Sequence, residues 1–460
     1  MTTRITLTSC LVLLMIVPSL QAQTLLSGPV VGHTTPTSAR IWIETDEACA
    51  VKIHYWLEAR FQFQSSAGIP IMRGTAEGRT SPTPPHTGVI ELTGLKPGWL
   101  VYYEVEIAGK PVRPNTPQVF SLLPEAAQNG PVPSFAVAFA SCMYPARVPV
   151  QPIWDQVALH RPAVLLLIGD NNYMPNPKGA YETTQDVVEY AMVRYHRYLR
   201  DLPGLRSVLS TTPTYGIWDD HDFGPDNSDR TFRWKDLSLS LFKKYYPNPS
   251  AGLPDVPGVF TSFDIGDAQF FLLDDRYHRD PNDAPDRNTM LGAGQLAWLK
   301  QSLKDSKATF KVIVNGGTLL VDRQGSGEYW ASFGQERDQF LSWLAENRIT
   351  GVLFAAGDWH VGTLNRLHRP QDPYPFYELL SSNAGVSLPP PPEAETGQAH
   401  YRFHQYIGTE YRGYNFGLMT FSGPRGSRAV SLQIIDSQGE PRIQLNLTEH
   451  DLTPEWRSSR

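Results

Sequence analysis

The sequence predicts an α/β (or α+β) domain with a layered sheet, preceded by an all-β domain. Three observations lead to this prediction. About the first hundred residues after the N-terminus alternate apolar and polar residues at the period of half-buried strands. From Phe135 onward, short continuous apolar runs alternate with helical patterns, which is typical of buried strands joined by helices. Several runs end in ionisable residues, which indicates a site along one edge of the sheet.

Length and composition exclude some classes of protein. The chain has 460 residues, which is enough for two or three domains with a large core. Its formal net charge of −6 is mild, and no long basic run occurs, so nucleic acid is not an expected partner. After removal of the first 22 residues, Cys49 and Cys142 are the remaining cysteines. We expect Cys49 to be a buried free thiol.

Residues 1–22 have the pattern of a cleaved export signal. Arg4 supplies a positive charge, Cys10–Val17 is a short apolar run, and Leu20–Ala22 fits a cleavage site. The run is too short to span a bilayer as a helix. The alternative is a hydrophobic strand or an anchor. We expect an exported protein, periplasmic or secreted, with no membrane span after cleavage.

Residues 23–122 are expected to form the all-β domain. Ala39–Glu44, Val51–Trp56 and Gly88–Thr93 alternate apolar and polar side chains, and Leu95–Glu106 predicts a turn followed by a strand. The stretch resembles a fibronectin type III-like sandwich. It contains no catalytic cluster, so we expect it to be structural or to shape the rim of a neighbouring site.

Residues 131–435 are expected to form the second domain, and residues 436–460 a polar C-terminal tail. Helical patterns separate the apolar runs along this second domain. The runs predicted as buried strands are Phe135–Ala140, Ala163–Ile168, Tyr215–Trp218, Phe270–Leu273, Phe310–Val314 and Gly351–Ala356, with closing strands at Phe416–Phe421 and Ala429–Ile435.

The most informative of these strand ends follows Trp218. Asp219, Asp220, His221 and Asp222 come next without a gap. Four ionisable groups beside a core are costly unless a cation or a reaction needs them. The alternative is a solvated acidic turn. Two other predicted strands also end in acidic residues, Asp170 and Asp358, which favours a functional site.

The repeated pattern gives a set of candidate metal ligands. Carboxylates with one or two imidazoles suit hard or borderline divalent and trivalent cations. A carboxylate bridging two such ions is the usual centre of a two-metal hydrolase, in which the ions activate water and stabilise charge on phosphate oxygens. The candidate ligands are Cys142, Asp170, Tyr173, Asp219, Asp220, Asp358 and His360.

The candidate catalytic residues are His221, Asp222 and Arg276. His221, beside the ligands, is placed to protonate a leaving alcohol. Arg276 is expected to grip phosphate through a two-pronged hydrogen bond, or else to pair with Asp274 or Asp275. Some candidate ligands have alternatives too. Taken singly, the histidine at 360 suits a structural role, and the cysteine at 142 and the tyrosine at 173 suit a core.

The order of motifs resembles a known family. Ser-Cys, Gly-Asp-Asn-x-Tyr, Trp-Asp-Asp-His-Asp, Leu-Asp-Asp-Arg and Gly-Asp-x-His follow one another as in the alkaline phosphatase D family. Its members are exported, metal-dependent phosphomonoesterases and phosphodiesterases of the metallophosphatase superfamily. The resemblance covers residues 27 to 420. It implies a metallophosphatase-type layered sheet domain preceded by the fibronectin type III-like sandwich.

The resemblance also implies how the ligands are used. A cysteine, here Cys142, stands in place of the Asp-x-His motif that is usual in the superfamily. Its thiolate would hold a ferric ion together with Asp170 and Tyr173. Asp220 would bind a second ion, for which the family suggests calcium, and other divalent ions stay open. His221 would be the catalytic histidine, and the Gly-Asp-x-His motif would complete the site.

The chain departs from the family pattern near the pocket but not at the ligands. Asp226-Asn227, Asn172 and Trp359 differ from the residues usual there, which leaves substrate choice open. We expect a metal-dependent phosphoesterase acting on small-molecule phosphate mono- or diesters. The alternatives are a non-catalytic exported binding protein with a degenerate metal site, and a hydrolase of another ester on the same site.

Overall fold

The computed structural model describes residues 23–59, 72–112, 118–123, 132–174, 180–284, 289–321, 329–386, 404–408 and 410–454. The expected export signal at 1–22 lies outside these residues. Within the described ranges, no helix is both long enough and apolar enough to cross a membrane.

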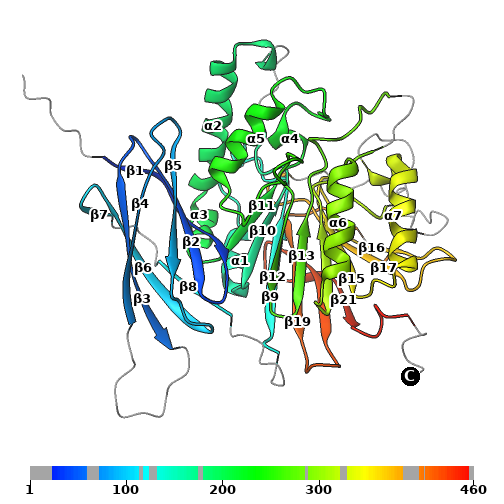
Figure 1. The fold of residues 1–460 in the computed structure, drawn as a ribbon. Coiled ribbons are helices and arrows are strands. Elements are labelled where there is room, and N and C mark those ends of the chain that lie inside the picture. The colour runs from blue at the N-terminus through cyan, green and yellow to red at the C-terminus, as the bar shows by residue number, and fades with distance from the viewer. Residues whose placement is uncertain are drawn as a thin grey trace, which may run out of the picture.

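The N-terminal domain consists of two antiparallel sheets that enclose a core of their own (Figure 1). The alternation seen in the sequence places one face of each strand inside, where Ile41, Ile53 and Cys49 are buried; Cys49 is a free thiol, as expected. One sheet contains β1 (Leu25–Thr34), β2 (Ser38–Thr45) and β5 (His86–Thr93). The other contains β3 (Ala50–Ala59), β4 (Met72–Arg79), β6 (Trp99–Ile107), β7 (Lys110–Val112) and β8 (Val119–Ser121).

The second domain is built on two mixed sheets. The six-stranded sheet has the order β11-β10-β9-β19-β20-β21, in which β9, β10 and β11 are parallel. The seven-stranded sheet has the order β12-β13-β14-β15-β17-β16-β18, in which β13, β14, β15 and β17 are parallel. The strands of the first sheet are β9 (Phe135–Ala140), β10 (Val164–Ile168), β11 (Thr214–Ile217), β19 (Asn415–Ser422), β20 (Ala429–Asp436) and β21 (Pro441–Thr448). Those of the second are β12 (Thr261–Ile265), β13 (Ala268–Leu272), β14 (Phe310–Val314), β15 (Val352–Ala356), β16 (Gly362–Leu367), β17 (Phe376–Ser381) and β18 (His404–Tyr406).

Helices and the facing sheet bury both sides of the central strands, as their continuous apolar runs require. The two sheets share one core, in which the Phe270 and Phe421 rings, from different sheets, lie 6.2 Å apart. On the seven-stranded side, the Trp298 ring of α6 packs against Phe271. The helices are α1 (Ile153–His160), α2 (Gln185–Asp201), α3 (Pro203–Leu209), α4 (Asp220–Phe223), α5 (Lys235–Tyr245), α6 (Ala293–Asp305) and α7 (Gly334–Glu346), with short 3₁₀ turns at Ala180–Glu182 and Trp330–Phe333.

The C-terminal residues differ from the expected tail at 436–460. Pro441–Thr448 forms β21, which pairs antiparallel with β20 at the edge of the six-stranded sheet. Ile443 and Leu447 are buried there, in the period-two pattern of a half-buried strand. Beyond it, Leu452 is fully buried, and its carbonyl accepts a hydrogen bond from the Gly351 amide.

The N-terminal domain is docked on the second domain through hydrogen bonds. Nε1 of Trp42 donates to the carbonyl of Lys244 over 2.7 Å, and the Tyr103 hydroxyl donates to the carbonyl of Ser210 over 2.8 Å. Figure 1 shows α2, α3 and α5 standing between the N-terminal sheets and the strands β10 and β11. The helices α2 and α3, which follow β10, and α5, which follows β11, therefore also contact the N-terminal domain.

Candidate metal centre

The carboxyl ends of the parallel strands bring the predicted site residues to one edge of the second domain. Cys142 follows β9, Asp170 follows β10, Asp219 follows β11, and Asp358 follows β15. The backbone there is strained. Of the nine non-glycine residues with positive φ in the described part of the chain, five lie at this edge: Cys142 (55°), Tyr144 (44°), Asp170 (51°), Asp358 (76°) and His360 (55°). Such strain costs roughly 1–3 kcal/mol per residue and is concentrated at functional sites.

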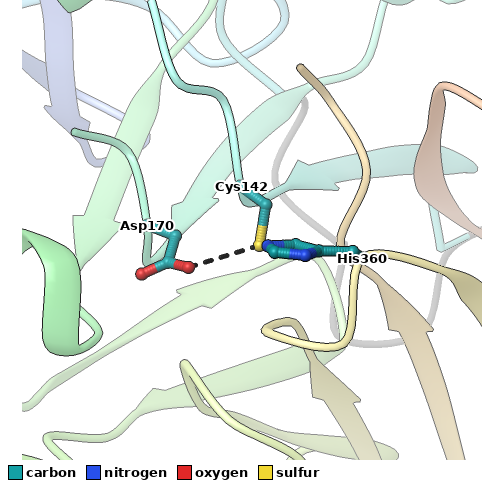
Figure 2. Close-up of side chains that lie close together, drawn as sticks. All are labelled: Cys142, Asp170 and His360. Atoms are coloured by element: carbon teal, nitrogen blue, oxygen red, sulfur yellow. Dashed lines mark hydrogen bonds between the residues drawn. The ribbon is translucent and has the colours of Figure 1, made fainter. Parts of the chain in front are cut away.

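A first group of donor atoms comes from Cys142, Asp170 and His360, which lie within 4.8 Å of one another. Figure 2 shows the three side chains converging on one point. The Cys142 sulfur is 3.5 Å from Oδ2 of Asp170. The Tyr173 hydroxyl donates to the same oxygen over 2.6 Å and lies 3.0 Å from Nε2 of His360. The structure therefore brings four of the predicted ligands together.

A second group consists of Asp170, Asp220 and His221, again within 4.8 Å. Asp170 is common to both groups, so its carboxylate is placed to join two cation positions. Its other oxygen, Oδ1, is buried without a hydrogen-bond partner in the described part of the chain. An orphaned buried carboxylate oxygen is costly unless a cation binds it, which fits a bridging ligand.

Burial and mutual repulsion shift the protonation equilibria of these groups toward their neutral forms. Burial, followed by the negative charge of Asp220, raises the pKa of Asp170 well above its usual value. Burial and the Asp170 charge likewise raise the pKa values of the Cys142 thiol and the Tyr173 phenol. Burial lowers the pKa of His360, which leaves its imidazole neutral and able to bind a metal. Cations at this point would reverse the first three shifts by stabilising the anions.

Asp219 lies outside both groups and is paired with Arg276. Arg276 is fully buried and forms an ion pair with Asp219, and its Nε lies 3.7 Å from an oxygen of Asp275. The structure therefore shows the expected contact between Arg276 and Asp275, although the nearer partner of Arg276 is Asp219. The guanidinium of Arg276 has no exposed surface in this structure. Asp219 also caps α4 by accepting from the Asp220 amide.

Asp222 holds the loop that carries Asp170 and Tyr173. Its Oδ1 accepts from the Asn172 amide over 2.9 Å, and its Oδ2 accepts from the amides of Asn171 and Asp219, each over 3.2 Å. Burial raises its pKa to about 7 despite these donors. The carboxylate thus ties the loop after β10 to the loop after β11.

Asp358 lies close to the centre without belonging to either group. Its negative charge raises the pKa values of Cys142 and Asp170, after the effect of burial, and its side chain is half-buried. The side chain of His221 is 23% exposed, and its Nε2 is 3.5 Å from an oxygen of the exposed Asp226. Of the three predicted catalytic residues, His221 is therefore partly exposed, whereas Arg276 is fully buried.

Two features of the site were missed from the sequence. The ring of Tyr173 is sandwiched between Tyr144, at 4.7 Å and 15°, and His221, at 4.2 Å and 31°. The Asn227 amide donates to Oδ2 of Asp220 over 2.6 Å and holds that carboxylate. Tyr144 lies only two residues after Cys142, but a lone aromatic in a loop gives no sign of such a stack.

The donors fit two metal ions of different character. The first group offers a thiol, a phenol and an imidazole besides the shared carboxylate, which suits a transition metal; the second is richer in carboxylate oxygen. A layered α/β domain with paired cation sites at its strand ends defines a metal-dependent hydrolase. The chain belongs to the PhoD-like phosphatase family, whose model matches residues 135–416. It is thus a metal-dependent phosphoesterase.

Comparison with solved structures agrees with this fold. The structure of PhoD superposes with a TM-score of 0.66 at 17% identity, covering 91% of this chain and 88% of the other. A purple acid phosphatase from yellow lupin seeds superposes with a TM-score of 0.63 at 11% identity, covering 93% and 74%. Residues 22–124 match a domain of unknown function, DUF7800. No sequence of a curated protein matches the chain significantly.

Proposed function

We propose that this enzyme hydrolyses small-molecule phosphate mono- or diesters at a two-cation centre in which Asp170 is the bridging ligand. The observation that carries the proposal is that Asp170 belongs to both donor groups and has a buried oxygen without a hydrogen-bond partner. The rival of a non-catalytic binding protein is disfavoured because both donor groups are complete.

The ligand chemistry supports a ferric ion in the first group and calcium or another divalent ion in the second. Cys142, Tyr173 and His360 would hold the first with Asp170, because thiolate is a poor ligand for calcium. Asp220 would hold the second with Asp170. When bound, such ions activate a water molecule and neutralise charge on the phosphate oxygens.

The remaining residues of the centre orient and protonate. His221 lies beside Asp170 and Asp220, so an ester held there has the imidazole within reach of its leaving oxygen. The Asp226 carboxylate lies 3.5 Å from Nε2 of His221, and the Tyr173 ring packs against the imidazole, so both contacts orient it. His221 then gives its proton to the departing alcohol.

We also propose that the enzyme is exported. The apolar run and cleavage pattern of residues 1–22 favour a periplasmic or secreted enzyme. We also retain the proposal that the N-terminal domain is a fibronectin type III-like sandwich. Its two facing antiparallel sheets support that proposal.

A panel of phosphate monoesters and diesters, assayed with metal analysis of the purified protein, tests the function. We expect turnover of at least one phosphate ester class, with about two metal ions per chain as the two donor groups imply. Turnover of carboxylic or sulfate esters alone would favour the rival hydrolase. Absence of turnover with both metals bound would favour the binding protein.

A further inference from the structure

We propose that the N-terminal domain positions the metal-binding loop, through a buried path that runs from Glu44 by way of Tyr245 and His196 to Asn172. The kinetic part of this inference rests on the proposed function. The metal-binding part does not.

The path begins inside the metal centre. Asn172 lies between the ligands Asp170 and Tyr173, and its amide is held by Asp222. Its side-chain Nδ2 donates to Nδ1 of His196 over 3.3 Å. His196 is on α2, so this bond ties the loop after β10 to that helix. Both side chains are buried.

The path continues through a ring stack between two helices. The His196 ring lies 4.4 Å from that of Tyr245, the last residue of α5, at an angle of 15°. Arg200, one turn after His196, donates to the His196 carbonyl over 3.0 Å. Its guanidinium lies over both the Tyr245 ring and the ring of Trp42, at 4.9 and 4.8 Å. Burial lowers the pKa of His196, which keeps its ring neutral and its Nδ1 able to accept.

The path ends on β2 of the N-terminal domain. Glu44 is fully buried, and its Oε1 accepts from the Tyr245 hydroxyl over 3.1 Å and from Arg197 over 2.7 Å. Arg197 is on α2, next to His196. The Glu44 carboxylate therefore accepts hydrogen bonds from both α2 and α5, the helices that carry the stacked rings.

These contacts have a functional consequence beyond domain docking. Groups that orient metal ligands indirectly usually change metal affinity or activity by about 10–100-fold when removed. Asn172 departs from the residue type usual at this point of the motif, and here it provides the side chain that reaches α2. Glu44 and His196 are thus positioning residues of the metal centre.

The test uses variants that keep each shape but remove one bond. His196→Phe keeps the stack on Tyr245 and cannot accept from Asn172, while Tyr245→Phe keeps the ring and loses the bond to Glu44. Glu44→Leu removes the acceptor for Arg197 and Tyr245, and Glu44→Gln retains an acceptor oxygen. Tyr103→Phe is the control, because it removes an interdomain hydrogen bond to Ser210 that has no contact with the path.

Manganese and calcium affinities of the metal-free full-length protein are measured by calorimetry, together with kcat, KM and the melting temperature. We expect His196→Phe, Tyr245→Phe and Glu44→Leu to weaken metal binding about tenfold and to lower kcat more than KM. Glu44→Gln should restore both, and Tyr103→Phe should change only the melting temperature.

Melting temperatures that fall as in Tyr103→Phe, with metal affinities unchanged, would overturn the inference. If His196→Phe does not fold, Tyr245→Phe decides alone, since it lacks only one oxygen. A wild type that lacks phosphoesterase activity would remove the proposed function, and the expected losses of metal affinity would still support the positioning path.

Discussion

The Tyr173 hydroxyl donates a hydrogen bond of 2.6 Å to Oδ2 of Asp170. The phenol and the carboxylate are thus held at one point, three residues apart in a single loop. Oδ2 also lies 3.5 Å from the Cys142 sulfur, and Oδ1 is left for a second contact. The Asp170 carboxylate is therefore shared by two groups of potential metal ligands.

Asp170→Asn should abolish turnover without unfolding the protein. We expect activity to fall more than about 100-fold, because a shared ligand matters more than a group that only orients one. Burial and the Asp220 charge raise the pKa of Asp170, so a neutral amide should leave the metal-free protein as stable or more stable. Kinetics with added metals and thermal unfolding without them check both parts. Asp255→Asn, at an exposed position, is the control; unchanged activity of Asp170→Asn would exclude bridging.

Cys142→Ser should remove colour, iron and most activity together. Thiolate and phenolate bound to a ferric ion absorb visible light, so the wild type is expected to be coloured and to bleach on reduction. Cys49→Ser changes the other buried free thiol, far from the donors in the N-terminal core, and should alter none of these properties. Absorption spectra and iron analysis of the three proteins decide. A colourless, iron-free and fully active wild type would remove the iron assignment.

His221→Ala should slow esters with poor leaving groups more than esters with good ones. A general acid contributes about 10²–10⁴-fold, mainly when the departing alkoxide is basic. The comparison is kcat for an alkyl phosphate against kcat for a nitrophenyl phosphate. Equal losses on both substrates would show that His221 orients groups in the site and does not donate the proton.

Arg276→Met should destabilise the protein, because Asp219 would remain buried without its partner. Breaking a buried pair on one side costs about 3–5 kcal/mol. Arg412→Met is the matched control, since Arg412 pairs with Glu410 on the surface, where the cost is below about 1 kcal/mol. Denaturant unfolding of the metal-free proteins gives both values. A stable Arg276→Met variant with a raised KM would instead restore the phosphate-binding role.

His33→Asn should flatten the pH dependence of stability below neutrality. Burial, and then the charge of Arg40, lowers the pKa of His33 from 6.5 to about 4, and its Nδ1 lies 3.1 Å from the Tyr215 hydroxyl. Folding therefore favours the neutral ring. Its contribution is complete above pH 6.5 and is lost as the pH falls toward 4, because the unfolded chain takes up a proton that the folded chain resists.

The expected loss for the wild type is about 1–2 kcal/mol, which allows for screening of the half-buried ring. Free energies of unfolding at pH 7 and pH 4.5 give the difference between the two proteins, in which other titrating groups cancel. Parallel curves for the wild type and His33→Asn would contradict the assignment.

The sequence alone determined the strands and the residues that follow them. Runs such as Phe135–Ala140 and Phe310–Val314 coincide with β9 and β14, because a strand buried on both faces must be apolar throughout. Since the carboxyl ends of parallel strands meet at one edge, Cys142, Asp170 and His360 could be predicted to converge. The strand β21 was missed, although its alternation was visible, because a polar edge strand resembles a tail.

Only the tertiary structure decided where each acid of the run after β11 points. Asp219, Asp220 and Asp222 are nearly adjacent, yet their side chains leave the chain in different directions: toward Arg276, toward the Asp170 carboxylate and toward the Asn171-Asn172 amides. The four-residue helix α4 sets these directions. Likewise, Glu44 stands in an ordinary alternating strand, and its grip on α2 and α5 depends on how the two domains pack, which no local pattern encodes.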